Sequence, residues 1–138
     1  MFSMNHQIAP YINFQGRARE AMELYQSIVG GKLELYAAGE QGAPRPAEPG
    51  DSIQHARLTG DGFLVIGSDG HPSYPPTAGD NMALVLVTSD RAALQAAFEK
   101  LAEGGKIKMP LSEGPWGGVA AWLTDRFGIN WNLDLEPE

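Results

Sequence analysis

The chain has 138 residues, a length typical of one domain that folds around its own core, and it contains no cysteine for disulfides or thiolate metal sites. Its formal net charge is -7, from 10 Lys and Arg against 17 Asp and Glu, so no basic surface is available to neutralise nucleic-acid phosphates. No stretch approaches the roughly 18 apolar residues that span a bilayer, and we expect a cytoplasmic protein that binds neither nucleic acid nor membrane.

Two glycine pairs divide the chain into similar halves. Gly30-Gly31-Lys32-Leu33 recurs 74 positions later as Gly104-Gly105-Lys106-Ile107. A helical spacing of apolar residues precedes each pair, over 18–29 and 94–101. Glycine accepts the left-handed backbone that ends a helix, and Ser89 or Asp90 offers an N-cap for the second one. The glycine pairs therefore predict the ends of two helices.

Strand-like runs surround each predicted helix. They cover residues 8–14, 32–36, 53–58 and 63–68 in the first half, and 82–88, 106–109, 119–124 and 130–135 in the second. Each half therefore has the order βαβββ. Residues 37–51 are rich in glycine and proline without periodicity, which predicts a loop with the features of a mobile lid.

This order of elements predicts an α+β fold built from two pseudo-repeated modules in a single domain covering 1–138. Module 1 covers about residues 6–70, the linker residues 70–79, and module 2 about residues 80–136. With its helix on one face, each module needs cover for the other face, so the modules are expected to curl into a curved, partly open mixed sheet around a cavity. Exposed sheet edges and an apolar seam between modules predict a homodimer.

A family resemblance is carried by seven short segments in the same order. They are 10–14, 18–25, 30–31, 53–58, 67–69, 116–117 and 125–133, the last reading Asp125-Arg126-Phe127-Gly128-Ile129-Asn130-Trp131-Asn132-Leu133. Together they resemble the PhnB-like branch of the vicinal oxygen chelate superfamily, which includes glyoxalase I, bleomycin-resistance proteins and extradiol dioxygenases. The resemblance implies the glyoxalase/bleomycin resistance fold, whereas the branch has no settled chemistry.

Some members of this branch carry a methyltransferase label, and the residues of this chain do not support it. A nucleotide-type cofactor needs a glycine-rich turn between a parallel strand and a helix, and the sequence offers none. We therefore expect no cofactor.

The resemblance also implies where metal ligands would lie. Metal-dependent members of the superfamily take His, Gln or Glu from the first and fourth strands of each half. The corresponding positions here hold Pro10 or Tyr11, Ile66 or Gly67, Asn81, and Asn132. None of them offers the imidazole or carboxylate that Zn²⁺ or Ni²⁺ prefers, which predicts a protein that binds no metal.

Four residues are the candidate ligand-binding site: Tyr11, His55, Trp116 and Asn132. Strand alternation turns His55 and Asn132 away from the strongly apolar positions, and we expect all four side chains to converge on one cavity. Each also has a structural alternative. His55 is equally consistent with a hydrogen-bonded structural residue, Tyr11 with core packing, Trp116 with loop packing and Asn132 with a solvated face. Asp69 and His71, at a strand end, are expected to form a solvated turn.

The resulting interpretation is a metal-independent protein that binds a small molecule, or a cofactorless enzyme whose catalytic residues the sequence does not identify. Two alternatives stay open. One is a metal-dependent lyase or dioxygenase with unusual ligands such as His55, Asp69 and Asp134. The other is a structural or regulatory dimer with a vestigial cavity.

Overall fold

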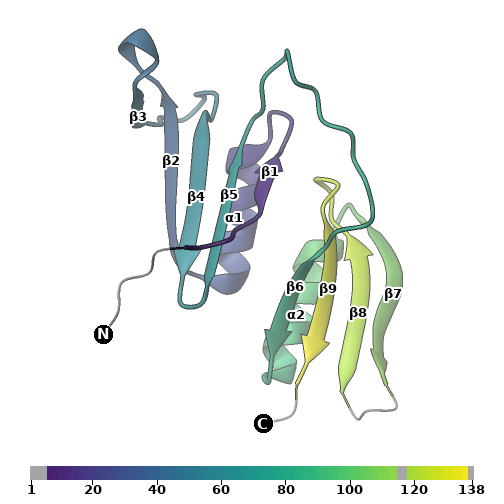
Figure 1. The fold of residues 1–138 in the computed structure, drawn as a ribbon. Coiled ribbons are helices and arrows are strands. Elements are labelled where there is room, and N and C mark those ends of the chain that lie inside the picture. Colours follow the sequence, from purple (N-terminus) through teal and green to yellow (C-terminus); the bar gives the residue numbers. More distant parts are fainter. Residues whose placement is uncertain (1–5, 115–117, 137–138) are drawn as a thin grey trace. The chain divides into compact units, whose positions relative to one another are not determined.

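The computed structural model describes residues 6–114 and 118–136 (Figure 1). The chain divides between Pro76 and Thr77 into two compact units, an N-terminal and a C-terminal one. No helix in the described ranges is long and apolar enough to cross a membrane.

The N-terminal unit consists of one helix packed on a mixed sheet of five strands. Its elements are β1 (Tyr11–Asn13), α1 (Ala18–Val29), β2 (Lys32–Ala38), a 3-10 turn (Glu40–Gly42), β3 (Pro44–Pro46), β4 (His55–Gly60) and β5 (Phe63–Ser68). The strand order is β1-β5-β4-β2-β3, with β1 parallel to β5 and the other pairs antiparallel.

One face of this sheet packs against α1. The helix buries Ala21, Met22 and Tyr25, and the alternate residues Ala56 and Leu58 of β4 are fully buried beneath it. Because side chains alternate along a strand, the residues between them point to the other side. We call that side, which carries the side chains of β4 that point away from α1, the distal face of the N-terminal sheet.

The C-terminal unit repeats the plan with four strands. Its elements are β6 (Leu84–Thr88), α2 (Arg91–Ala102), β7 (Lys106–Glu113), β8 (Val119–Thr124) and β9 (Asn130–Leu135), in the strand order β6-β9-β8-β7. β6 is parallel to β9, and the other pairs are antiparallel. The predicted α+β fold with a repeated helix and strand order is confirmed.

The glycine pairs have the same two roles in both units. Gly30 and Gly104 have φ angles of 72° and 74°, positive values that glycine adopts readily, and both lie where a helix ends. The second glycine of each pair allows a close backbone approach. A Cβ on Gly31 would lie 2.5 Å from the carbonyl oxygen of Thr59, and one on Gly105 would overlap the carbonyl oxygen of Thr124.

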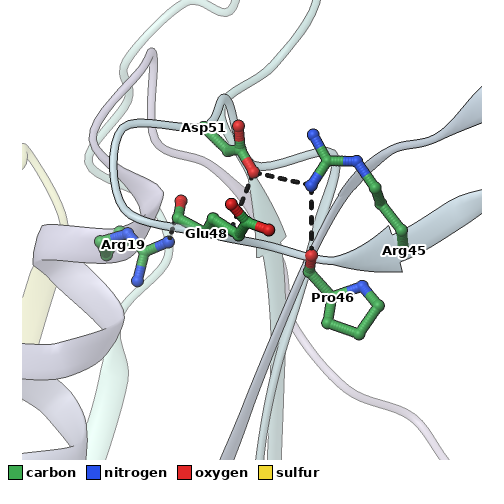
Figure 2. Close-up of polar contacts among 5 residues, drawn as sticks. All are labelled: Arg19, Arg45, Pro46, Glu48 and Asp51. Carbon is green, nitrogen blue, oxygen red and sulfur yellow. Dashed lines mark hydrogen bonds and ion pairs between the residues drawn. The ribbon is translucent and has the colours of Figure 1, made fainter.

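The prediction that residues 37–51 form only a loop is wrong. β2 continues to Ala38, and β3 pairs antiparallel with it. Figure 2 shows the polar contacts that hold the segment: Arg45 Nη1 lies 2.8 Å from Asp51 Oδ2, which also accepts the backbone N–H of Glu48. The hydrogen bond from Arg45, followed by that from Glu48, lowers the pKa of Asp51. Arg19 of α1 donates to the Glu48 carbonyl at 3.0 Å, so the segment is tied to the helix.

Candidate functional site

A row of four paired residues crosses the distal face of the N-terminal sheet. Tyr11 of β1 is paired with Ile66 of β5, Ile66 with Arg57 of β4, and Arg57 with Glu34 of β2. The orientation of this row follows from Gly67, the neighbour of Ile66. A Cβ on Gly67 would meet the ring of Phe14, which packs on Tyr25 of α1, so Gly67 faces the helix and Ile66 faces the other side. Paired residues point to the same side, so this row points away from the helix.

Tyr11 is held at the edge of the distal face by its own hydroxyl. The phenol donates a hydrogen bond to Ser68 Oγ at 2.7 Å, and the backbone N–H of Gly70 donates to the same oxygen at 3.1 Å. Ser68 is buried, whereas Tyr11 is 62% exposed. The hydrogen bond therefore fixes the phenol group while the ring surface stays available for contact.

His55 lies at the start of β4 beside a pocket. It is paired with Tyr36 of β2, and the two ring centroids are 6.2 Å apart. A pocket of about 360 Å³ is lined by Tyr36, Pro44, Gln54 and His55. Pro44 belongs to β3, so the segment expected to act as a lid forms part of this pocket wall.

Tyr36 and Glu34 form a hydrogen-bonded pair on the same face. The Tyr36 hydroxyl donates to Glu34 Oε2 at 2.8 Å. This bond, the negative charge of Glu34 and burial raise the pKa of Tyr36, while the charge of Arg57 opposes the shift. Lys32 Nζ lies 3.9 Å from the same carboxylate oxygen. Tyr36 therefore stays protonated at neutral pH and engages Glu34.

Arg57 is a residue of this face that sequence reasoning left out of the candidate site. It is half-buried, and no hydrogen bond or ion pair reaches its guanidinium within the described residues 6–114 and 118–136. The alternation that pointed to His55 also placed Arg57 on the same face. The sequence could not show that its neighbour Glu34 is engaged elsewhere.

Asn132 lies in the C-terminal unit, on the side of β9 that points away from α2. Its side-chain Nδ2 donates to the carbonyl of Ala121 at 3.1 Å, and the residue is buried. Its paired neighbours are Val85 and Trp122, which are 55% and 43% exposed. Trp116 lies outside the described residues. The structure thus brings Tyr11 and His55 to one face, and the convergence of all four residues stays a prediction.

The register corrects one position in the comparison with metal-dependent relatives. Tyr11 pairs in parallel with Ile66 in one unit, and Val85 pairs in parallel with Asn132 in the other. Val85 is therefore the counterpart of Tyr11. The prediction that placed this ligand position at Asn81 is wrong, because Asn81 precedes β6. The 74-residue offset of the glycine pairs leads from Tyr11 to Val85 directly.

Asp69 is a structural residue, in contrast to the solvated turn expected there. Arg17, at the N-cap of α1, makes no capping hydrogen bond with its side chain. Asp69 supplies the missing acceptor: its Oδ1 accepts the N–H of Ala18 at 2.8 Å, and its Oδ2 accepts the N–H of Ile53 at 2.7 Å. Both carboxylate oxygens thus bind backbone groups. In the described part of the chain, no three His, Asp or Glu side chains are grouped to hold a metal ion.

Comparisons with known proteins give consistent matches over nearly the whole chain. A family model described as 3-demethylubiquinone-9 3-methyltransferase matches residues 6–134. Protein PA1353 from Pseudomonas aeruginosa is 36% identical over 97% of this chain and 100% of that chain, with a TM-score of 0.82. The PhnB protein from Bacillus cereus is 26% identical over 95% of this chain and 100% of its own, with a TM-score of 0.72. A glyoxalase/bleomycin resistance protein/dioxygenase superfamily member from Sphaerobacter thermophilus, 20% identical over 95% of this chain and 98% of its own, shares the fold with a TM-score of 0.54.

Proposed function

Because the chain belongs to the PhnB-like family and has the fold of the glyoxalase/bleomycin resistance/dioxygenase superfamily, we propose that it is a metal-independent protein that binds a small molecule on the distal face of the N-terminal sheet. The observation that carries the proposal is the half-buried polar character of this face around the His55 pocket. A sheet surface that packs on a core is apolar, whereas one that faces solvent is exposed, and a half-buried polar surface fits neither case. Mostly apolar walls with a few placed polar groups are typical of ligand sites.

The methyltransferase description of the family model is not part of this proposal. The connection from β1 to α1 consists of residues 14–17, Phe-Gln-Gly-Arg, and contains one glycine. A nucleotide-type cofactor is bound by a glycine-rich turn whose backbone approaches the phosphates closely, and one glycine does not make such a turn.

Ligand mapping tests the proposed site. In a fragment screen followed by NMR of the ¹⁵N-labelled protein, we expect the shifted amides to lie around Tyr11, His55 and Ile66. His55→Ala should weaken binding about 5-fold, the effect of losing one hydrogen bond of about 1 kcal/mol. The matched control is His71→Ala, which removes an exposed histidine from a loop of the same unit. Fragments that map instead to the hollow bounded by Lys106 and Asn130 in the C-terminal unit would contradict the assignment.

Metal independence is tested by elemental analysis of protein purified without chelators. We expect far less than one Zn, Ni, Mn or Fe ion per chain, both as purified and after incubation with zinc chloride and dialysis. The support comes from the phenol, amide and aliphatic groups at Tyr11, Asn132 and Val85, which are poor ligands for these ions. One tightly held ion per chain would favour the metal-dependent alternative.

A single vicinal oxygen chelate domain, a homodimer and a cytoplasmic location complete the proposal. The outer strands of the two sheets, β1 and β3 in one and β6 and β7 in the other, offer edges that a second chain can cover. Light scattering at micromolar concentration would measure the oligomeric state, and cell fractionation would measure the location. A monomeric protein in the light-scattering experiment would remove the homodimer from the proposal.

A further inference from the structure

Arg57 differs from the other arginines of its unit in having no carboxylate partner among the residues that the structure describes. Arg17 is paired with Glu20, Arg19 with Glu23, and Arg45 with Asp51. Arg57 lies in the inner strand β4 and is half-buried, yet none of the described residues accepts a hydrogen bond from it. A guanidinium carries five N–H donors and a permanent charge, so partial burial without an anion is unfavourable.

The nearest candidate partner in register is already engaged. Glu34 is paired with Arg57 across β2 and β4, a position at which opposite charges usually attract. Its Oε2 instead accepts the Tyr36 hydroxyl at 2.8 Å and lies 3.9 Å from Lys32 Nζ. The charge of Arg57 still acts on Tyr36, whose pKa it lowers against the larger upward effect of Glu34. Arg57 is two residues from His55 along β4, so the two side chains are neighbours on the distal face.

On the side of Arg57 opposite Glu34, the surface of the sheet is apolar and ends at the ring of Tyr11. Ile66 is paired with Arg57, and Tyr11 with Ile66. Neighbouring strands are about 4.8 Å apart, so Arg57 and Tyr11 are separated by about 10 Å. Ser68 holds the Tyr11 hydroxyl while the ring stays exposed. A ligand bound at Arg57 would therefore have an aliphatic surface and an aromatic ring beside it.

We propose that the distal face binds a small monocarboxylate, with its carboxylate on Arg57 and its apolar body against Ile66 and Tyr11. This inference rests on the proposed function and names the class of its ligand. A planar carboxylate accepts two parallel N–H bonds from a guanidinium. One guanidinium balances a single negative charge, whereas a phosphate dianion would also be repelled by Glu34 in the neighbouring strand and by the net charge of -7.

A matched set of three probes tests the ligand class on the full chain. Phenylacetate, its neutral analogue phenylacetamide and phenyl phosphate are titrated into ¹⁵N-labelled protein, with the Arg57 Nε–H signal and the Ile66 amide as reporters. We expect phenylacetate to bind about tenfold more tightly than phenylacetamide, the effect of a charge-assisted hydrogen bond. Phenyl phosphate should bind more weakly than phenylacetate.

Variants separate recognition of the charge from a structural effect. Arg57→Gln should weaken phenylacetate binding about tenfold and leave phenylacetamide binding unchanged, because only the acid uses the guanidinium. Arg57→Lys, which keeps the charge but loses the planar fork, should give an intermediate loss. Arg17→Gln removes an arginine paired on the surface of α1 and should change neither affinity. If Arg57→Gln fails to fold, Arg57→Lys and the three probes on the unaltered protein still decide the question.

The outcomes distinguish this inference from the function on which it rests. Equal binding of the acid and the amide at the distal face would overturn the carboxylate proposal and leave a small-molecule site in place. Tighter binding of phenyl phosphate than of phenylacetate would also overturn it. So would an equal loss of affinity for phenylacetate and phenylacetamide in Arg57→Gln. Shifts of all probes outside the distal face would contradict both proposals.

Discussion

Replacing Asp125 with alanine is expected to lower the free energy of unfolding of the C-terminal unit by about 4 kcal/mol, since it removes the acceptor for several N–H groups. Asp125 is 3% exposed and follows β8. Its Oδ1 accepts the backbone N–H of Phe127 at 2.9 Å and of Ile129 at 3.0 Å, and its Oδ2 accepts the indole N–H of Trp131 at 2.9 Å. Urea unfolding followed by circular dichroism and tryptophan fluorescence measures the change.

Further variants separate the hydrogen bond to the Trp131 indole from those to the backbone of the turn. Asp125→Asn keeps the size of the side chain and one acceptor oxygen, so an intermediate loss is expected. Combining it with Trp131→Phe gives a double-mutant cycle whose coupling energy should be about 1 kcal/mol or more. Asp61→Ala changes an exposed turn residue between β4 and β5 and should alter stability by less than about 0.5 kcal/mol. A loss below about 1 kcal/mol in Asp125→Ala would show that the buried N–H groups find other acceptors.

Four elements with a clear apolar pattern were predicted to the residue, whereas α2 begins three residues before its expected start at residue 94. The helix α1 covers Ala18–Val29, and the strands β5, β8 and β9 have the bounds that their alternation predicts. These segments carry their own pattern because one side packs against a helix. Of the two N-cap candidates that the sequence offered, Ser89 and Asp90, the structure selects Asp90, whose Oδ1 accepts the N–H of Ala93 in the first turn of α2.

Elements that depend on distant partners could not be predicted in the same way. β3 has the sequence Pro-Arg-Pro, which has no strand propensity, and it is held by pairing with β2 and by the contact between Arg45 and Asp51. β7 continues to Glu113 through Pro110, past the predicted end at Met109, with register shifts that interrupt its pairing with β8. Both cases follow from tertiary pairing.

The candidate site shows the same division between local pattern and tertiary context. Alternation placed His55 on the side of β4 away from α1, which the register supports. Arg57 becomes a candidate ligand-binding residue because Glu34 accepts its hydrogen bond from Tyr36, and only the structure shows that contact. Likewise, Asp69 reads in the sequence as a turn residue, although it caps a helix that begins 51 positions earlier.

Replacing Gly105 with alanine is expected to destabilise the C-terminal unit by about 3 kcal/mol, at the upper end of the cost of overpacking. The φ angle of Gly105 is not positive, so the cost comes from space alone. The added Cβ would overlap the carbonyl oxygen of Thr124, and a backbone atom cannot move aside as a flexible side chain can. Thermal and urea unfolding monitored by circular dichroism measure the loss.

Other glycines of the chain provide the matched controls. Gly128→Ala and Gly30→Ala replace residues with φ of 85° and 72° that have nothing within 4 Å of the new Cβ, so only the backbone conformation adds a cost. We expect about 1 kcal/mol at Gly128 and about 2 kcal/mol at Gly30, whose ψ of -156° is typical of glycine alone. Gly31→Ala combines a φ of 94° with a Cβ 2.5 Å from the Thr59 oxygen, and it should destabilise the N-terminal unit at least as much as Gly105→Ala destabilises the other. Equal losses at all four positions would mean that backbone conformation alone explains the glycines. The expected order instead attributes the repeated pair to two separate needs, a helix end at its first residue and a close approach of two backbones at its second.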